Sequence, residues 1–234
     1  MRVAAIADIH CRANTPELIP QILEGVGDAA DVLLLAGDLT DTGLPDEAEC
    51  LVEQLQKIDM PKIGILGNHD HESGHPEEIK KVLKEGGITV LDGTLHEIGE
   101  VGFVGTKGFC GGFGENLVQP FGEAALKDFI RTGIDEAMTL ENALAKLSCK
   151  HKVAILHYAP VKDTLIGEPP ELFPFLGSSR LANAIDRRGV DVIVHGHAHH
   201  GSPSGKTAGN IPVHNVSRYV QFKNFQRCYC VFDL

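Results

Sequence analysis

The sequence predicts a layered α/β fold, and three features of the chain indicate it. Five short runs of four or five apolar residues, rich in Val, Ile, Leu and Ala, recur along the chain. None of these runs alternates with polar residues, which is typical of strands that are buried on both faces of a sheet. Helical patterns separate the first three runs, as they do in the βαβ units of parallel sheets.

The elements of this fold follow in order along the chain. The predicted buried strands are Val3–Ala7, Val32–Ala36, Ile63–Leu66, Val153–Leu156 and Val190–Val194. Helices are expected near Pro16–Gly25 and Asp46–Ile58, between the first three strands. A further helix is predicted over Pro76–Glu85, because proline suits the first position, acidic residues the first turn and lysines the last turn, and two glycines follow it.

The rest of the chain predicts further strands, a long helix and a long loop. A helical pattern covers Glu123–Leu147, and Gly133 interrupts it, so one helix or two are expected. Tyr158–Gly177 contains four prolines and little periodicity, as in loops that border functional sites. The additional strands, of which the first three form an apparent meander, are Thr89–Leu91, Leu95–Ile98, Val101–Gly105, Ile211–Val216 and Cys228–Phe232. Without repeats or linker-like segments, the 234 residues are expected to form one domain, residues 1–234.

The charge and the apolar content restrict the partners of the protein. The formal net charge is -11, and such a surface repels long polyanions, so no extended nucleic acid is expected to bind. A small phosphate ester can still bind where metal cations reverse the local potential. The first apolar run is too short for a signal peptide, and no stretch approaches the roughly 18 apolar residues of a membrane span. We therefore expect a cytoplasmic protein with no membrane contact; the sequence leaves its oligomeric state open.

The six cysteines are dispersed along the chain, mostly among apolar residues. Buried free thiols explain them better than disulfides do in a cytosolic protein. Cys228 and Cys230 fall on the same face of a predicted strand, and no second cysteine pair lies near them, so they are expected to be core residues rather than metal ligands.

Metal-capable side chains follow every one of the five predicted buried strands. The strand ends are Asp8-Ile9-His10, Gly37-Asp38-Leu39-Thr40-Asp41, Gly67-Asn68-His69-Asp70, His157 and His195-Gly196-His197-Ala198-His199. Ligands of α/β proteins bind beyond the carboxyl ends of the strands. Clustered polar groups at a buried edge are costly unless they are paired or bind a metal. The five ends together therefore predict a metal site, although each is a weak signal alone.

These strand ends resemble the calcineurin-like metallophosphoesterase superfamily. Its pattern is D-x-H, G-D-x-x-D, G-N-H-[DE], a lone His and G-H-x-H, and all five blocks occur in order between Asp8 and His199. The chain is also similar to the small class III cyclic nucleotide phosphodiesterases. The resemblance implies a four-layer αββα sandwich, with two mixed β-sheets flanked by helices and the metals at one edge.

The resemblance also implies which residues bind metal. One ion is expected on Asp8, His10, Asp38 and His199, and the other on Asp38, Asn68, His157 and His197. A carboxylate has enough lone pairs for Asp38 to bridge two cations. This mixture of nitrogen and oxygen ligands favours transition metals such as Mn, Fe or Zn. Two ions roughly 3.5–4 Å apart can hold a bridging hydroxide, which would attack phosphorus in line.

The remaining expectations concern the roles of residues next to these ligands. His69 is expected to donate a proton to the leaving oxygen, with Asp70 orienting it, and Asp41 to support the ligands through a histidine. Cys11 stands where some branches of the superfamily carry glycine, and it is either a substrate-pocket residue or filler. Arg12 is a further candidate for phosphate contact.

Three functions are compatible with the sequence. The first is hydrolysis of small phosphodiesters, which the compact chain and its acidic charge favour. The alternative is a phosphomonoesterase or protein phosphatase, but the additional arginine pair of the superfamily's protein phosphatases is not seen near the motifs. A non-catalytic scaffold is the weakest interpretation, because the ligand set is complete.

Overall fold

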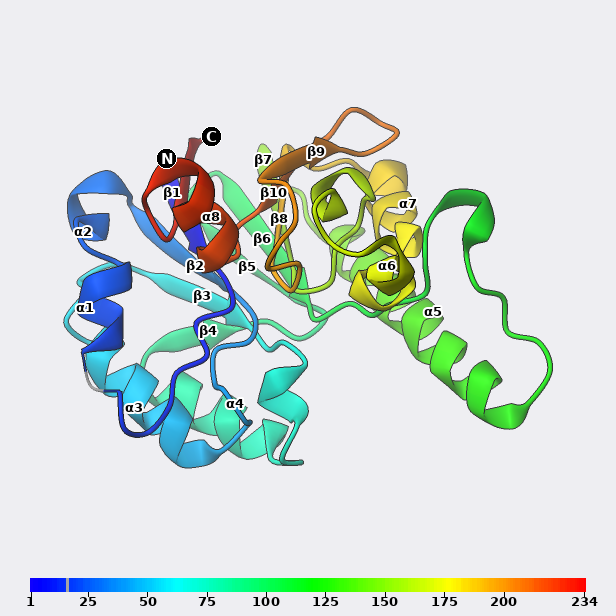
Figure 1. Cartoon of the computed structure of the whole chain (residues 1–234). Helices are drawn as coiled ribbons and strands as arrows, with labels where there is room; N and C mark the ends of the chain where they lie inside the picture. Colours follow the sequence, from blue (N-terminus) through cyan, green and yellow to red (C-terminus); the bar gives the residue numbers. More distant parts are fainter. Residues whose placement is uncertain (16) are drawn as a thin grey trace.

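The computed structural model describes residues 1–15 and 17–234, and in these ranges two β-sheets lie between two groups of helices (Figure 1). The first sheet has the strand order β11-β1-β2-β3-β4, and the second has the order β5-β6-β7-β8-β10-β9. Both sheets are mixed, because β11, β5 and β9 run antiparallel to their neighbours while the inner strands are parallel. This is the four-layer αββα sandwich that the resemblance implies.

The elements span nearly the whole chain. The strands are β1 (Arg2–Ile6), β2 (Val32–Ala36), β3 (Lys62–Ile65), β4 (Ile88–Val90), β5 (Thr94–Ile98), β6 (Val101–Thr106), β7 (His151–Leu156), β8 (Val192–His195), β9 (Ser204–Lys206), β10 (Pro212–Asn215) and β11 (Cys230–Asp233). The helices are α1 (Leu18–Ile22), α2 (Val26–Ala29), α3 (Pro45–Leu55), α4 (Pro76–Glu85), α5 (Ala124–Leu144), α6 (Phe173–Leu176), α7 (Ser179–Arg188) and α8 (Arg218–Phe225). No helix among the described residues has both the length and the apolar character to cross a membrane.

Three apolar clusters hold the four layers together and explain why the inner strands lack polar residues. Ile6 and Leu35 of the first sheet pack in a cluster with residues of α1, α3 and α4. The alternate residues of the same strands, such as Val3 and Leu34, pack between the two sheets against Phe103 of β6. A third cluster lies between the second sheet and helices α5 and α7. Each inner strand thus buries both faces, as parallel strands in layered proteins do.

The boundaries of the five predicted buried strands are confirmed to within two residues, and the helix over Pro76–Glu85 is confirmed as α4. The helix expected near Pro16–Gly25 is shorter than predicted. Pro16 itself lies outside the described residues, and the remaining segment forms α1, which ends before Gly25, where φ is +72°. The left-handed backbone of Gly25 precedes the separate short helix α2.

The expected meander is wrong, because its strands belong to different sheets. β4 pairs with β3 in the first sheet, whereas β5 and β6 form an antiparallel pair in the second. The chain changes sheets at Gly93, whose φ of +63° favours glycine.

The long helix α5 is continuous through Gly133. Glycine allows close packing there, since an added Cβ would lie 3.0 Å from the carbonyl oxygen of Cys110. Sequence patterns therefore placed the strands well but could not show which sheet each one joins.

Candidate metal centre

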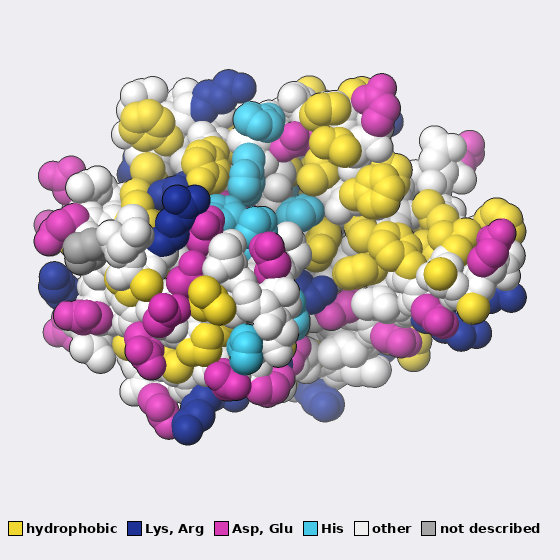
Figure 2. Space-filling view, turned by 60° about the horizontal axis from the view of Figure 1, so that its bottom comes forward, with side chains coloured by type: hydrophobic (Ala, Val, Ile, Leu, Met, Phe, Trp, Pro, Cys, Tyr) yellow, Lys and Arg dark blue, Asp and Glu magenta, His cyan; other side chains and the backbone are white. Residues whose placement is uncertain are grey.

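The predicted ligands come together where the strands of the two sheets end. Asp8, Asp38 and Asn68 follow β1, β2 and β3 of the first sheet, and His157 and the His197-Ala198-His199 segment follow β7 and β8 of the second. Figure 2 shows the histidines gathered in a hollow in the middle of one face, with acidic side chains beside them. Parallel strands bring their carboxyl ends to one edge, which explains why segments far apart in the sequence meet here.

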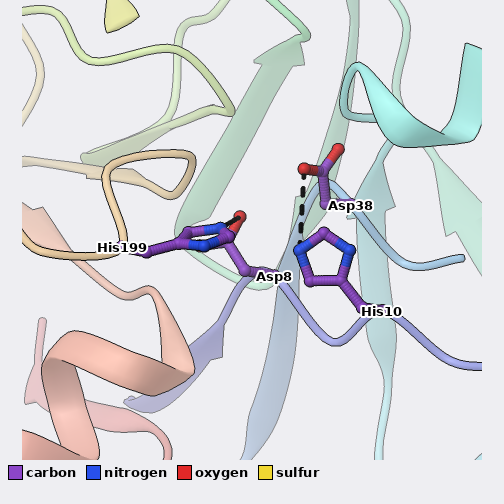
Figure 3. Close-up of side chains that lie close together, drawn as sticks. All are labelled: Asp8, His10, Asp38 and His199. Atoms are coloured by element: carbon purple, nitrogen blue, oxygen red, sulfur yellow. Dashed lines mark ion pairs between the residues drawn. The ribbon is translucent and has the colours of Figure 1, made fainter. Parts of the chain in front are cut away.

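The first cluster consists of Asp8, His10, Asp38 and His199, which point toward one another (Figure 3). Each offers a ligand atom, and these atoms all lie within 4.8 Å of one another. His199 Nε2 is 3.4 Å from Asp8 Oδ1, and His10 Nε2 is 3.9 Å from Asp38 Oδ2. Both ring nitrogens of His10 are buried without a hydrogen-bond partner in the described part of the chain. Buried polar atoms are rarely left unpaired, so a metal ion fits this arrangement.

The second cluster consists of Asp38, His157 and His197. His157 Nε2 lies 3.2 Å from Asp38 Oδ1 and 2.9 Å from Oδ1 of Asn68. The other ring nitrogen, Nδ1, lies 3.0 Å from the carbonyl oxygen of Ala36 and can only donate to it, which leaves Nε2 free to bind a metal. The two clusters share Asp38, and Asn68 adjoins the second cluster through its contact with His157. A third group of potential ligand residues, His10, Asp41 and His69, overlaps the first cluster.

The backbone at this edge is held in a conformation that side chains rarely adopt. Asp8, His10, Asp38 and His197 have φ values of 59°, 48°, 49° and 67°. Asp and His tolerate this left-handed region better than most residues, and such strain concentrates at functional sites. Close packing adds to the constraint, because a Cβ at Gly67 would collide with the Asp38 carboxylate. The loops thus have little freedom to move the ligands apart.

The carboxylates at the centre of the site favour positive charge. Burial lowers the pKa of His157, but the carboxylates of Asp38 and Asp8 outweigh this effect and raise the pKa to about 9. Burial and the neighbouring charge of His157 lower the pKa of His197 to about 3. Burial would raise the pKa of Asp8, yet His199 and His157 hold it below its usual value. The two carboxylates therefore favour positive charge near them, whereas His197 stays neutral, the form in which an imidazole binds a metal.

Asp41 lies beside the first cluster, at the place predicted for a supporting residue. Its Oδ1 is 3.6 Å from His10 Nδ1, and its backbone carbonyl accepts a 2.6 Å hydrogen bond from His69 Nδ1. Arg12 pairs with the same carboxylate, with Nε 2.7 Å from Oδ2. The Arg12 side chain is 63% exposed, so it lies at the outer rim rather than among the ligands.

The predicted contact between Asp70 and the His69 ring is wrong. Asp70 is fully buried, and its oxygens accept hydrogen bonds from three backbone N–H groups and one hydroxyl, those of Leu39, Thr40 and Gly67. Burial and the nearby charge of Asp38 raise the pKa of Asp70 to about 6. Asp70 thus ties together the loops that carry Asp38 and Asn68, while the Asp41 carbonyl orients His69.

Cys11 does not line the site. Its interpretation as a substrate-pocket residue is therefore wrong, and it instead fills space in the core, which was the alternative. Its side chain is fully buried in the cluster beneath α3, with Sγ 3.9 Å from Nε2 of Gln54. The turn at His10, with its positive φ, directs the next side chain into the core. Burial raises the pKa of the Cys11 thiol to about 12.

We therefore expect Cys11 to resist alkylation by iodoacetamide at pH 8 in the folded protein, because only the thiolate reacts. Mass spectrometry of the peptide that contains Cys11 checks this, and the same reaction in denaturant is the control. Rapid modification of the folded protein at this position would show that Cys11 is accessible.

His195 differs from the other histidines of its strand end, because it lies in the core and both of its ring nitrogens have hydrogen-bond partners. It is fully buried, with Nδ1 2.8 Å from the carbonyl oxygen of Gly196 and Nε2 2.8 Å from Oγ1 of Thr164. Burial lowers its pKa to about 4. Through Thr164, this histidine attaches the 158–177 loop to the end of β8 beside the metal ligands.

A family model for calcineurin-like phosphoesterases matches residues 1–201. The chain belongs to this family. No curated protein sequence matches it significantly. Family membership and the two ligand clusters together support a metal-dependent phosphoester hydrolase.

Solved structures of distant sequence share the fold. A phosphopantetheinyl hydrolase from Mycobacterium tuberculosis has a TM-score of 0.68 at 15% identity, over 98% of this chain and 95% of its own. The protein TT1561 of Thermus thermophilus has a TM-score of 0.62 at 15% identity, over 94% and 90% of the two chains. A putative 5'-nucleotidase from Staphylococcus aureus has a TM-score of 0.54 at 16% identity, over 92% of this chain and 48% of its own.

One neighbour of the metal centre was not predicted from the sequence. The ring of Tyr219, in α8, lies 4.8 Å from the ring of His199, measured between centroids. Helix α8 lies beyond the residues that the family model matches. The aromatic residues Tyr219 and Phe222, at positions i and i+3, were the available signal for a helix here.

Proposed function

We propose that this protein hydrolyses small phosphodiesters with two transition-metal ions, held by Asp8, His10, Asp38, Asn68, His157, His197 and His199. The observation that carries the proposal is the pair of ligand clusters that share Asp38. Their mixture of imidazole and oxygen ligands suits Mn, Fe or Zn. When bound, two such ions supply a nucleophile at neutral pH and neutralise charge on the phosphoryl oxygens.

The protein itself would position the substrate and move one proton. His69 is the group we assign to the leaving oxygen. Its Nδ1–H is fixed on the carbonyl of Asp41, so Nε2 is the nitrogen that can carry a proton to the substrate. The ring lies against His10 at a centroid distance of 4.6 Å, and its side chain is 36% exposed, so a substrate at the metal ligands can reach it.

Replacing His69 with Asn should lower kcat by roughly 100-fold for diesters with alkoxide leaving groups, since general-acid catalysis contributes at least this factor. The loss should be much smaller for 4-nitrophenyl esters, whose leaving group needs no proton. Steady-state kinetics on both substrate types, with metal content measured in parallel, check this. An equal loss on both types would show that His69 does not act as the acid.

The preference for small diesters rests on the acidic surface, which disfavours extended nucleic acid, and on the compact metal centre. We propose no membrane partner. A panel of phosphate mono- and diesters, tested with the metal-loaded protein, is the direct experiment. Much faster turnover of diesters would support the proposal, and activity on monoesters alone would select the phosphomonoesterase alternative. A protein that takes up no metal ion when metal is supplied, and that turns over none of these esters, would indicate a scaffold.

A further inference from the structure

A hollow of about 400 Å³ lies beside helix α8, and its lining residues are Arg218, Tyr219, Phe222, Lys223 and Cys228. All of them follow residue 201, where the match to the family model ends. The metal ligands, by contrast, all precede that point. The hollow is therefore a feature of this chain that its family motifs do not account for.

The start of α8 is attached directly to the metal centre. The backbone N–H of Arg218 donates a 3.1 Å hydrogen bond to the carbonyl of Ala7, the residue before Asp8. The ring of Tyr219 lies 4.8 Å from the ring of His199 and 6.4 Å from that of His10, measured between centroids. Tyr219 thus lies against the histidines of the first cluster and also lines the hollow, so the hollow adjoins those ligands.

The hollow exposes aromatic surface to solvent. Tyr219 is 40% exposed and Phe222 is 53% exposed. Arg218 holds Tyr219 in place, since its Nη2 donates a 2.9 Å hydrogen bond to the tyrosine hydroxyl and its Cζ lies 4.7 Å from the ring centroid. Single exposed apolar residues are common, but adjacent aromatic side chains around a concave site are typical of ligand pockets.

Two of the residues that line the hollow, Arg218 and Lys223, are cationic. In the described ranges of the chain, no carboxylate lies within 4.0 Å of the charged groups of Arg218 or Lys223. Nε of Arg218 is buried and lacks a hydrogen-bond acceptor there. The chain carries a net charge of -11, with 32 acidic residues against 21 basic ones, so carboxylates are abundant elsewhere. Two cations without acidic partners in one hollow favour an anionic ligand.

We infer that this hollow is a specificity subsite, which binds the organic group of a phosphodiester held at the metal centre and prefers an aryl group that bears a second negative charge. Phe222 and Tyr219 would contact the ring, and Arg218 and Lys223 would attract the added charge. The inference rests on the proposed function and deepens it, because it names the class of diester.

Three diesters with a single variable group test the subsite: dimethyl phosphate, methyl phenyl phosphate and methyl 3-carboxyphenyl phosphate. Each of the two aryl esters carries one methyl group and one aryl group. Either ester can therefore bind in the orientation that places its aryl group in the hollow. Their affinities for the metal-loaded protein are measured by calorimetric titration, or by kcat/KM where turnover occurs. We expect the phenyl ester to bind about tenfold better than dimethyl phosphate, and the carboxyphenyl ester about threefold better again.

Three substitutions in α8 distinguish the contribution of the aromatic contact from the contribution of the charge. Phe222→Ala should remove most of the gain from the phenyl group, and Arg218→Gln should remove the gain from the carboxylate alone, while Arg218→Lys should retain much of it. Phe225→Ala is the matched control, since Phe225 is a similarly exposed phenylalanine of the same helix that does not line the hollow. It should leave all three affinities unchanged.

Equal binding of the three esters to the unmodified protein would overturn the inference, as would the absence of binding by all three. It would also fail if Phe225→Ala cost as much as Phe222→Ala. The proposed function fails by a different result, namely that the metal-loaded protein turns over no diester, such as bis(4-nitrophenyl) phosphate. Diester turnover without ester selectivity would therefore reject the subsite alone.

Discussion

Replacing Asp38 with Ala should abolish both metal binding and turnover. Asp38 belongs to both ligand clusters, so its loss removes a ligand from each metal position at once. It would also leave His157 without the carboxylate that lies 3.2 Å from its Nε2. We expect less than one metal ion per chain by elemental analysis, against about two in the unmodified protein. Diester turnover should fall by at least about a thousandfold, which corresponds to roughly 4 kcal/mol in the activation barrier.

The backbone at Asp38 calls for a second variant. Its φ of 49° lies in the left-handed region, where Ala is disfavoured by roughly 1–2 kcal/mol but Asn is well tolerated. Asp38→Asn therefore keeps the local conformation and removes only the charge and one strong ligand atom. It should fold normally by circular dichroism and still lose most of its metal and activity.

The control for both variants is Asp128→Ala, because Asp128 is an exposed residue of α5 whose carboxylate pairs with Arg131 in the following turn. Its metal content and turnover should match those of the unmodified protein. If Asp38→Asn kept full turnover, a site in which one carboxylate serves two metal ions would be excluded.

The sequence could bring the candidate ligands to one edge because each lies within a few residues of the end of a strand that is itself easy to recognise. Asp8 follows β1, and His157 follows β7 without any intervening residue. Local spacing was therefore sufficient to place them at one edge. The grouping into two clusters came from the resemblance, and the distances between ligand atoms agree with it.

Features that depend on packing between distant segments could not be predicted in this way. The orientation of Cys11 depends on the positive φ of His10, which no residue pattern specifies. The position of Tyr219 depends on a hydrogen bond between Arg218 and Ala7, more than 200 residues apart in the chain. The role of Asp70 was misassigned because it is adjacent to His69 in sequence, whereas its hydrogen bonds run to Gly67 and to the loop after β2.

The hydrogen bonds of Asp70 explain why its role is structural. Gly67 N–H and Leu39 N–H donate to Oδ2 at 2.7 and 3.2 Å, and the N–H and hydroxyl of Thr40 donate to Oδ1 at 2.8 and 2.6 Å. The carboxylate is fully buried, so water cannot replace it. One side chain therefore satisfies donors on the loops after β2 and β3, which hold Asp38 and Asn68 in register.

Asp70→Ala should consequently destabilise the protein by about 3–5 kcal/mol, because it leaves several buried donors without an acceptor. Asp70→Asn should cost roughly half as much. Its amide oxygen can still accept from Gly67 and Leu39, and its NH₂ group can donate to the Thr40 hydroxyl, but the Thr40 N–H loses its acceptor. Urea unfolding of both variants measures these free energies, and Asp128→Ala should stay within about 0.5 kcal/mol of the unmodified protein. A residue that only oriented His69 would behave differently: Asp70→Ala would then lower kcat while leaving the free energy of unfolding unchanged.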